Sequence, residues 1–222
     1  MRTGLSRVEV LVVAGIGLLC VGLILPRVQA ARGDADRLTC ENNLRTLGTA
    51  FAEYEKANGG LPPRRTGFNN GEPYGGWGTA ILPHLGDEKT ARGYNPKLDY
   101  FDPGNKAAVE TPVAAFHCPA TPAGRTVIIE SQATANAANP DRDTVFSVKA
   151  GVSDYISSNG VLLPRGGYAL NFNDLGQMNG NSRQPMGDNG VTPLTAITDG
   201  TACTLLLIEQ AGRPEVWRAG KK

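Results

Sequence analysis

The sequence has little histidine, little methionine and no excess of charge of either sign. Two histidines and three methionines are too few for a histidine-rich metal site. The four cysteines form no Cys-x-x-Cys pair, which argues against zinc ribbons and thioredoxin-like redox sites. The 22 basic and 21 acidic residues nearly cancel, so the chain lacks the basic character expected of a nucleic-acid-binding protein.

Recognisable catalytic motifs are absent as well. The sequence contains no Walker loop, no nucleophile elbow and no HExxH pattern. The segment "ITDGT" at 197–201 places an aspartate before a glycine, but Asp-Gly is a common turn pair and a turn explains it better. We therefore expect that the protein is not an enzyme and needs no cofactor.

Glycine and proline are plentiful, with 28 and 15 residues among 222. Their abundance predicts many turns and only modest regular structure. The length suits one ordinary domain with an appendage. No internal repeat or second domain is apparent.

The appendage is an almost purely apolar run at residues 10–25, which Pro26 follows. One interpretation is a secretory signal that is cut after Ala30. Another is a plain membrane anchor, because the 18 residues of 8–25 fall within the roughly 17–25 that a spanning helix needs. Arginines flank the run on both sides, so their distribution does not decide its orientation.

A third interpretation is a prepilin-type leader that is cut between Gly4 and Leu5, with the apolar helix retained. Glu9 bears on this choice, because a carboxylate inserted in a bilayer costs a few kcal/mol and by default indicates a function. After such a cut, the α-amino group of Leu5 on a neighbouring subunit is its natural counter-charge. Alternatively, Glu9 lies among the lipid headgroups, where the positive end of the helix dipole favours it.

Beyond the apolar run, the spacing of apolar residues predicts a helix over 34–57. The stripe has spacings of 4, 3, 4 and 3, which place its members on one face of a helix. The segment "NGGLPP" at 58–63 ends it. The members of the stripe are Cys40, Leu44, Leu47, Phe51 and Tyr54.

The rest of the chain, 64–222, reads as a turn-rich β region. Short β-prone runs occur at 126–130, 144–148, 154–158 and 203–209. Long Gly/Asn-rich loops are expected at 64–76 and 171–190, and loops of that length are often functional. We predict an α+β domain in which a small antiparallel sheet packs against the long helix.

The order Gly4, Leu5, Glu9, apolar helix and Pro26 resembles the N-terminus of type IV pilins and of type II secretion pseudopilins, although Leu5 replaces the usual phenylalanine. Further blocks resemble a large prepilin-type family, the domain of unknown function 1559. They include "GWGTAILPHLGDEKTARGYN", "SDYISSNGV" and "ITDGTACTLLLIEQAGRPEVW". Longer members carry a C-terminal His-x9-Asp-Gly segment that this sequence lacks.

This resemblance implies a division into a leader (1–4), a transmembrane helix with its continuation (5–33) and an exported α+β domain (34–222). It implies that a prepilin peptidase removes the leader and methylates the Leu5 amine. The product would be a structural subunit, single-pass in the inner membrane, with its C-terminal domain periplasmic or extracellular. Its partners would be other pilin-like subunits, contacted through the N-terminal helices. The alternative is a tethered or secreted binding domain whose Asn/Gly-rich loops hold a glycan, an ion or cargo.

The family pattern carries a cysteine at the positions of both Cys40 and Cys118, and in an exported domain such a pair can link a helix to a loop. The resemblance thus implies a Cys40–Cys118 disulfide, with two buried thiols as the alternative. Cys203 is our candidate for an unpaired thiol, although it is also able to replace one partner of the pair.

Two further groups of residues suit metals poorly. His117 beside Cys118 lacks two further spaced ligands for zinc, and His84 reads as a packed side chain. Asn139, Asp141 and Asp143 offer oxygen atoms at alternate positions, which suits calcium, but the glycine and glutamate of an EF-hand loop are missing. They remain weak calcium candidates, and we expect no metal.

Overall fold

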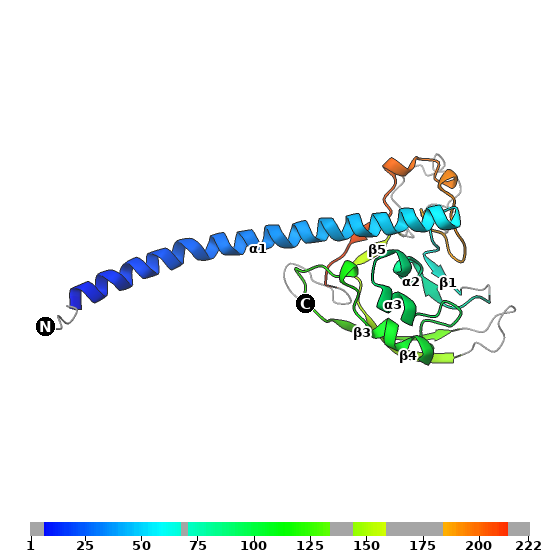
Figure 1. Ribbon diagram of the computed structural model, residues 1–222, viewed down its shortest axis with the longest axis horizontal. Helices are drawn as coiled ribbons and strands as arrows, with labels where there is room; N and C mark the ends of the chain where they lie inside the picture. The colour runs from blue at the N-terminus through cyan, green and yellow to red at the C-terminus, as the bar shows by residue number, and fades with distance from the viewer. Residues whose placement is uncertain (1–6, 68–70, 134–143, 159–183, 213–222) are drawn as a thin grey trace, which may run out of the picture.

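A 52-residue helix, α1 (Arg7–Asn58), dominates the computed structural model, which describes residues 7–67, 71–133, 144–158 and 184–212. α1 passes through Pro26 without a break, although proline removes one backbone donor. The helix projects far from a globular head, here defined as the described residues from Gly59 onward (Figure 1). The apolar segment and the helix predicted over 34–57 are therefore one element.

The N-terminal half of α1 touches no other part of the described structure. Twelve large aliphatic side chains between Val8 and Leu25 are exposed. This segment has the length and apolar composition of a membrane span, a description that a signal sequence also meets.

The C-terminal half of α1 lies across the head (Figure 1). Leu47, Ala50 and Phe51 are buried there. Leu47 and Phe51 belong to the predicted stripe, so the prediction is confirmed for these two residues. Leu44 was also predicted to face the core, and this prediction is wrong because the residue is 36% exposed. The helix ends at Gly59, whose φ of +77° suits glycine and whose N–H donates to the Glu55 carbonyl over 2.7 Å.

Among the described residues, the strands form three separate antiparallel pairs. β3 (Thr126–Ala133) pairs with β4 (Thr144–Gly151), and β5 (Tyr155–Ser157) pairs with β6 (Leu207–Glu209). β1 (Arg65–Thr66) and β2 (Gly75–Gly76) pair at the two ends of the long loop predicted over 64–76, of which residues 68–70 lie outside the described residues. The α+β class is confirmed, with small two-stranded sheets in place of one sheet.

Short helices fill the space between the hairpins. They are α2 (Trp77–Ile81), α3 (Glu88–Gly93) and α4 (Lys106–Glu110), with 3₁₀ turns at Leu82–His84, Pro103–Asn105, Ala114–Phe116, Leu194–Ala196 and Thr201–Cys203. The last of these turns occupies part of the strand predicted over 203–209. Gly200, with φ of +84°, makes the predicted Asp-Gly turn before it.

One core joins α1 to the head. Phe51 of α1 stacks on Trp77 of α2, with ring centroids 5.6 Å apart, and Phe116 meets Trp77 edge-on at the same distance. Tyr155 of β5 is also fully packed in this core. The head is thus seated on α1 by large aromatic side chains, which contribute strongly to buried area.

Candidate functional site

The predicted site residues fall at two distant places, or outside the described residues. Glu9 lies in the first turn of α1, at the end remote from the head. Cys40 and Cys118 lie at the junction of α1 and the head. Gly4 and Leu5 lie outside the described residues, and so do Asn139, Asp141 and Asp143, so the processing and calcium predictions stay predictions.

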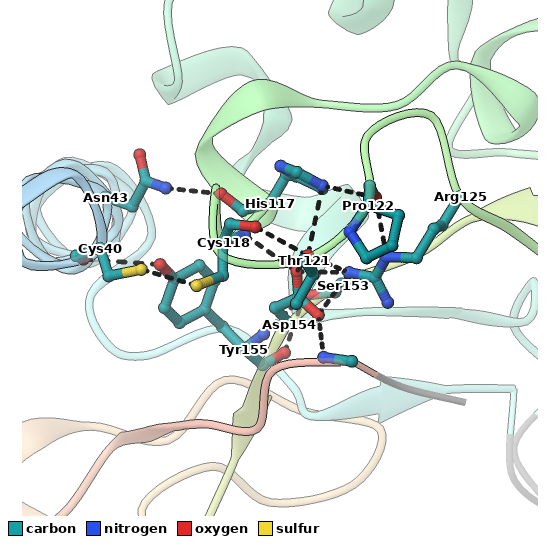
Figure 2. Close-up of polar contacts among 11 residues, drawn as sticks. Cys40, Asn43, His117, Cys118, Thr121, Pro122, Arg125, Ser153, Asp154 and Tyr155 are labelled. Atoms are coloured by element: carbon teal, nitrogen blue, oxygen red, sulfur yellow. Dashed lines mark hydrogen bonds and ion pairs between the residues drawn. The ribbon is translucent and has the colours of Figure 1, made fainter. Parts of the chain in front are cut away.

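At the junction, the two cysteine side chains face each other across the joint (Figure 2). Their Sγ atoms are 2.8 Å apart and not covalently joined in the structure. Both residues are buried, Cys40 at 7% and Cys118 at 2% exposure. Cys203 lies elsewhere, exposed, in the turn Thr201–Cys203.

Asp154, fully buried just before β5, holds the Cys118 loop in place. Its carboxylate accepts hydrogen bonds from the N–H groups of Cys118 and Gly212, both over 2.9 Å, and one of its oxygens lies 3.1 Å from the Thr121 hydroxyl oxygen. Arg125 Nη2 donates to both carboxylate oxygens, over 2.7 and 2.6 Å (Figure 2). One carboxylate therefore joins the Cys118 loop, β5 and the segment that follows β6.

From the other side, α1 contacts the same loop through a polar side chain. Asn43 Nδ2 donates to the His117 carbonyl over 2.8 Å. The Thr121 hydroxyl donates to the Cys118 carbonyl over 2.7 Å. The backbone on both sides of Cys118 is therefore fixed, and the direction of its side chain toward α1 is fixed with it.

Burial and hydrogen bonding shift the titration of these groups. Burial alone raises the pKa of Asp154, but the bonds from Arg125 and from the N–H groups of Cys118 and Gly212 outweigh it, so the pKa lies below its ordinary value. Burial is the main cause that raises the pKa of both Cys40 and Cys118, and the nearby Glu209 carboxylate raises both further.

The sulfurs and Glu209 also form a group with metal-ligand chemistry. One ligand atom from each of Cys40, Cys118 and Glu209 lies within 4.8 Å of the others. Thiolates that share a tetrahedral zinc ion are about 3.8 Å apart, because each Zn–S bond is about 2.3 Å. The observed 2.8 Å is too short for that arrangement, so the geometry of the two sulfurs fits a covalent pair better.

The two histidines have structural surroundings. His84 stacks edge-on against Tyr54, and its Nδ1 lies 3.4 Å from a Glu53 carboxylate oxygen. Nε2 of His117 lies 3.1 Å from the Pro122 carbonyl. Neither joins the group of metal-type ligands among the described residues.

A second buried carboxylate, that of Asp188, ties together other segments of the head. Asp188 accepts hydrogen bonds from both Arg64 and Arg65, whose Nη2 atoms each come within 2.8 Å of it. Burial raises the pKa of Asp188, but the two guanidinium groups outweigh burial and hold the pKa below its usual range.

Beside these arginines the head is hollowed by a cleft of about 840 Å³. The cleft runs between the β1–β2 hairpin and β5. Trp77 and Phe116 supply aromatic surface, and Ser153 and Gln210 supply polar groups. Such a mixture of aromatic and polar lining is typical of small-ligand sites.

Sequence reasoning missed Asp154, Arg125 and Asp188. Asp154 is the first residue of a predicted strand and Arg125 precedes another, but they are 29 positions apart, and no spacing rule connects them. Arg64 and Asp188 are 124 positions apart. Only the fold brings these charges together.

Fold and junction define a small α+β head carried on a long helix whose first half is apolar and exposed. The chain belongs to the family described as protein of unknown function (DUF1559), whose model matches residues 29–222. No curated protein and no solved structure matches the chain.

Proposed function

We propose that the protein is a non-catalytic, pilin-like structural subunit that is anchored in the inner membrane and assembles through α1 into a secretion- or pilus-type filament. The single observation that carries this is the exposed apolar half of α1, which continues without a break into the helix on which the head is seated. Because α1 is one continuous helix, it holds the head at a fixed distance from its apolar half, which needs an apolar environment.

The energetics favour insertion of the apolar segment into a membrane. Its twelve exposed large aliphatic residues contribute about 4–7 kcal/mol toward insertion on biological scales. A charge placed at the bilayer centre costs about 3 kcal/mol, and Glu9 lies at the edge of the segment, where the cost is smaller. Insertion therefore remains favourable with Glu9 present.

Glu9 gives the segment a reason to associate with copies of itself. By resemblance to prepilins, a peptidase cuts between Gly4 and Leu5 and methylates the new amine, which then stands four residues before Glu9. A neighbour's amine neutralises the carboxylate, which is costly to leave unpaired in lipid. Gly15, Gly17 and Gly22 support close packing of such helices, because a Cβ on any of them would meet nothing within 4 Å in the single chain.

The test is substitution of Glu9 in the full-length chain, expressed with an active prepilin peptidase and the filament machinery. We expect Glu9→Ala to abolish assembly, measured by shear release and sedimentation, while circular dichroism and protease resistance of the head stay unchanged. Glu41→Ala is the matched control, because Glu41 is an exposed acid of the same helix that contacts Arg37 at the surface. Normal assembly of Glu9→Ala would contradict the filament role.

The cleft beside Arg64 and Trp77 favours a second candidate, a membrane-tethered domain that binds a small ligand. Trp77 and Phe116 offer ring faces, and the arginine and serine groups offer hydrogen bonds, a combination that suits a carbohydrate. We expect saturable binding of the full-length chain to an array of neutral oligosaccharides if this role holds. Absence of binding across the array would contradict the ligand-binding role, and it would not affect the filament role.

A further inference from the structure

We propose that Cys40 and Cys118 close a disulfide that locks the head onto α1, and that this bond forms on the oxidising, exported side of the membrane. The two sulfurs already lie 2.8 Å apart, while a disulfide bond is about 2.05 Å long. Closing the difference takes a sub-ångström movement. The bond would join α1 directly to the head, 78 positions further along the chain.

The surroundings of Cys118 direct it to this partner. Asp154 holds its N–H, Thr121 holds its carbonyl, and Asn43 of α1 holds the preceding carbonyl. Figure 2 shows these hydrogen bonds to the loop, with the Cys118 side chain facing Cys40. Because the loop is already ordered, little further conformational entropy is lost when the bond closes.

The chemistry balances with an external disulfide as oxidant, of the kind that exported thiol–disulfide oxidoreductases carry. One thiolate of the pair attacks it, forms a mixed disulfide and releases one thiolate of the carrier. The second thiolate of the pair then displaces the remaining carrier sulfur. The pair loses two protons and two electrons, and the carrier leaves as two thiols.

The structure also indicates when the bond closes. In the folded head both thiols are buried, and Glu209 of β6 brings a carboxylate beside them, which disfavours the reactive thiolates. We therefore expect oxidation to accompany folding, before β6 packs against β5. Once closed, the buried bond is shielded from small reductants.

The bond has a topological consequence. Disulfides persist in exported compartments and are rare in the cytosol. The inference therefore rests on the proposed function in one respect, the export of the head. The disulfide does not depend on cleavage at Gly4 or on assembly. An experiment can therefore contradict the disulfide without contradicting the filament role, and the reverse.

The first experiment counts thiols in the full-length protein, purified from membranes and alkylated in denaturant with N-ethylmaleimide. We expect two labelled cysteines, Cys20 and Cys203, before reduction and four after it. Trypsin should release a reducible cross-link between peptides 38–45 and 107–125. Four labelled cysteines without reductant, a cross-link to Cys203, or bound zinc found by elemental analysis would each overturn the proposal.

The second experiment measures thermal unfolding with and without reductant. A cross-link that closes so long a loop should raise the unfolding midpoint by about 10 °C. Wild type and the matched control Cys203→Ser should both lose this increment once they have been unfolded, reduced with dithiothreitol and refolded in its presence. Cys40→Ala should show the low midpoint in either condition. Equal midpoints for oxidised and reduced wild type would contradict a lock at this joint. The thiol count decides the question even if Cys40→Ala folds poorly.

Discussion

At the scale of single residues, the junction depends on buried charges that are fully compensated. Asp154 has no exposed surface, and the bonds it accepts tie the segment 118–125 and Gly212 to the start of β5. Arg125 is its ion-pair partner, with a side chain only 16% exposed. Removing one partner of a buried pair costs far more than the pair contributes, because the other charge is left without compensation.

We therefore predict that Arg125→Met lowers the free energy of unfolding by about 3–5 kcal/mol. Arg92→Met is the control, because Arg92 and Glu88 form an exposed pair on α3, and such pairs contribute at most about 1 kcal/mol. Urea denaturation of both variants measures the difference. Equal losses would show that Asp154 does not depend on Arg125.

Acid should weaken the head through the same carboxylates. Asp154 and Asp188 have pKa values below those of an unfolded aspartate, about 3.9, so the folded head binds fewer protons than the unfolded chain. Their contribution is complete above about pH 5 and is lost as the pH falls below about 4 toward the folded pKa values. Unfolding free energies that stay constant between pH 5 and pH 3 would contradict this.

At the scale of elements, periodicity predicted α1 well because one face of the helix is covered over a long stretch. It failed at Leu44, which is 36% exposed although Cys40, one turn earlier, and Leu47, the next member of the stripe, are both buried. Three of the four predicted strands formed, and the fourth formed only at 207–209, because Cys203 ends a 3₁₀ turn and residues 204–206 have no regular structure. The pairing of β5 with β6 across 50 residues was beyond any local pattern.

Replacing two glycines by alanine, one inside α1 and one just after it, should change the free energy of unfolding in opposite directions. A Cβ on Gly60 would lie 2.5 Å from the Thr192 carbonyl oxygen, where Leu61 and Thr192 exchange two backbone hydrogen bonds. We expect Gly60→Ala to destabilise the head by about 1–3 kcal/mol through overpacking. Gly48→Ala meets nothing within 4 Å and lies inside the helix, so it should stabilise by about 0.5–1 kcal/mol. Chemical denaturation measures both changes in stability. A change of the same sign in the two variants would contradict the packing argument.

At the scale of the whole molecule, the protein consists of an exposed apolar segment and a head whose core includes residues of the C-terminal half of α1. Sequence and resemblance were enough to expect this division, because hydropathy and helix period are local signals. The two salt-bridged aspartates and the cleft needed the fold. Family membership covers residues 29–222 and carries no activity, so function has to be argued from the exposed segment and the junction.

The most direct test of the filament role is the mature N-terminus of the protein, read by intact mass and peptide fragmentation after expression with an active prepilin peptidase. The filament role predicts a chain that begins at Leu5 with a methylated amine and retains α1. A chain that begins at Ala31 would mean that the apolar segment is an export signal. An uncut Met1 would mean that it is a plain anchor, and either result would contradict assembly through Glu9.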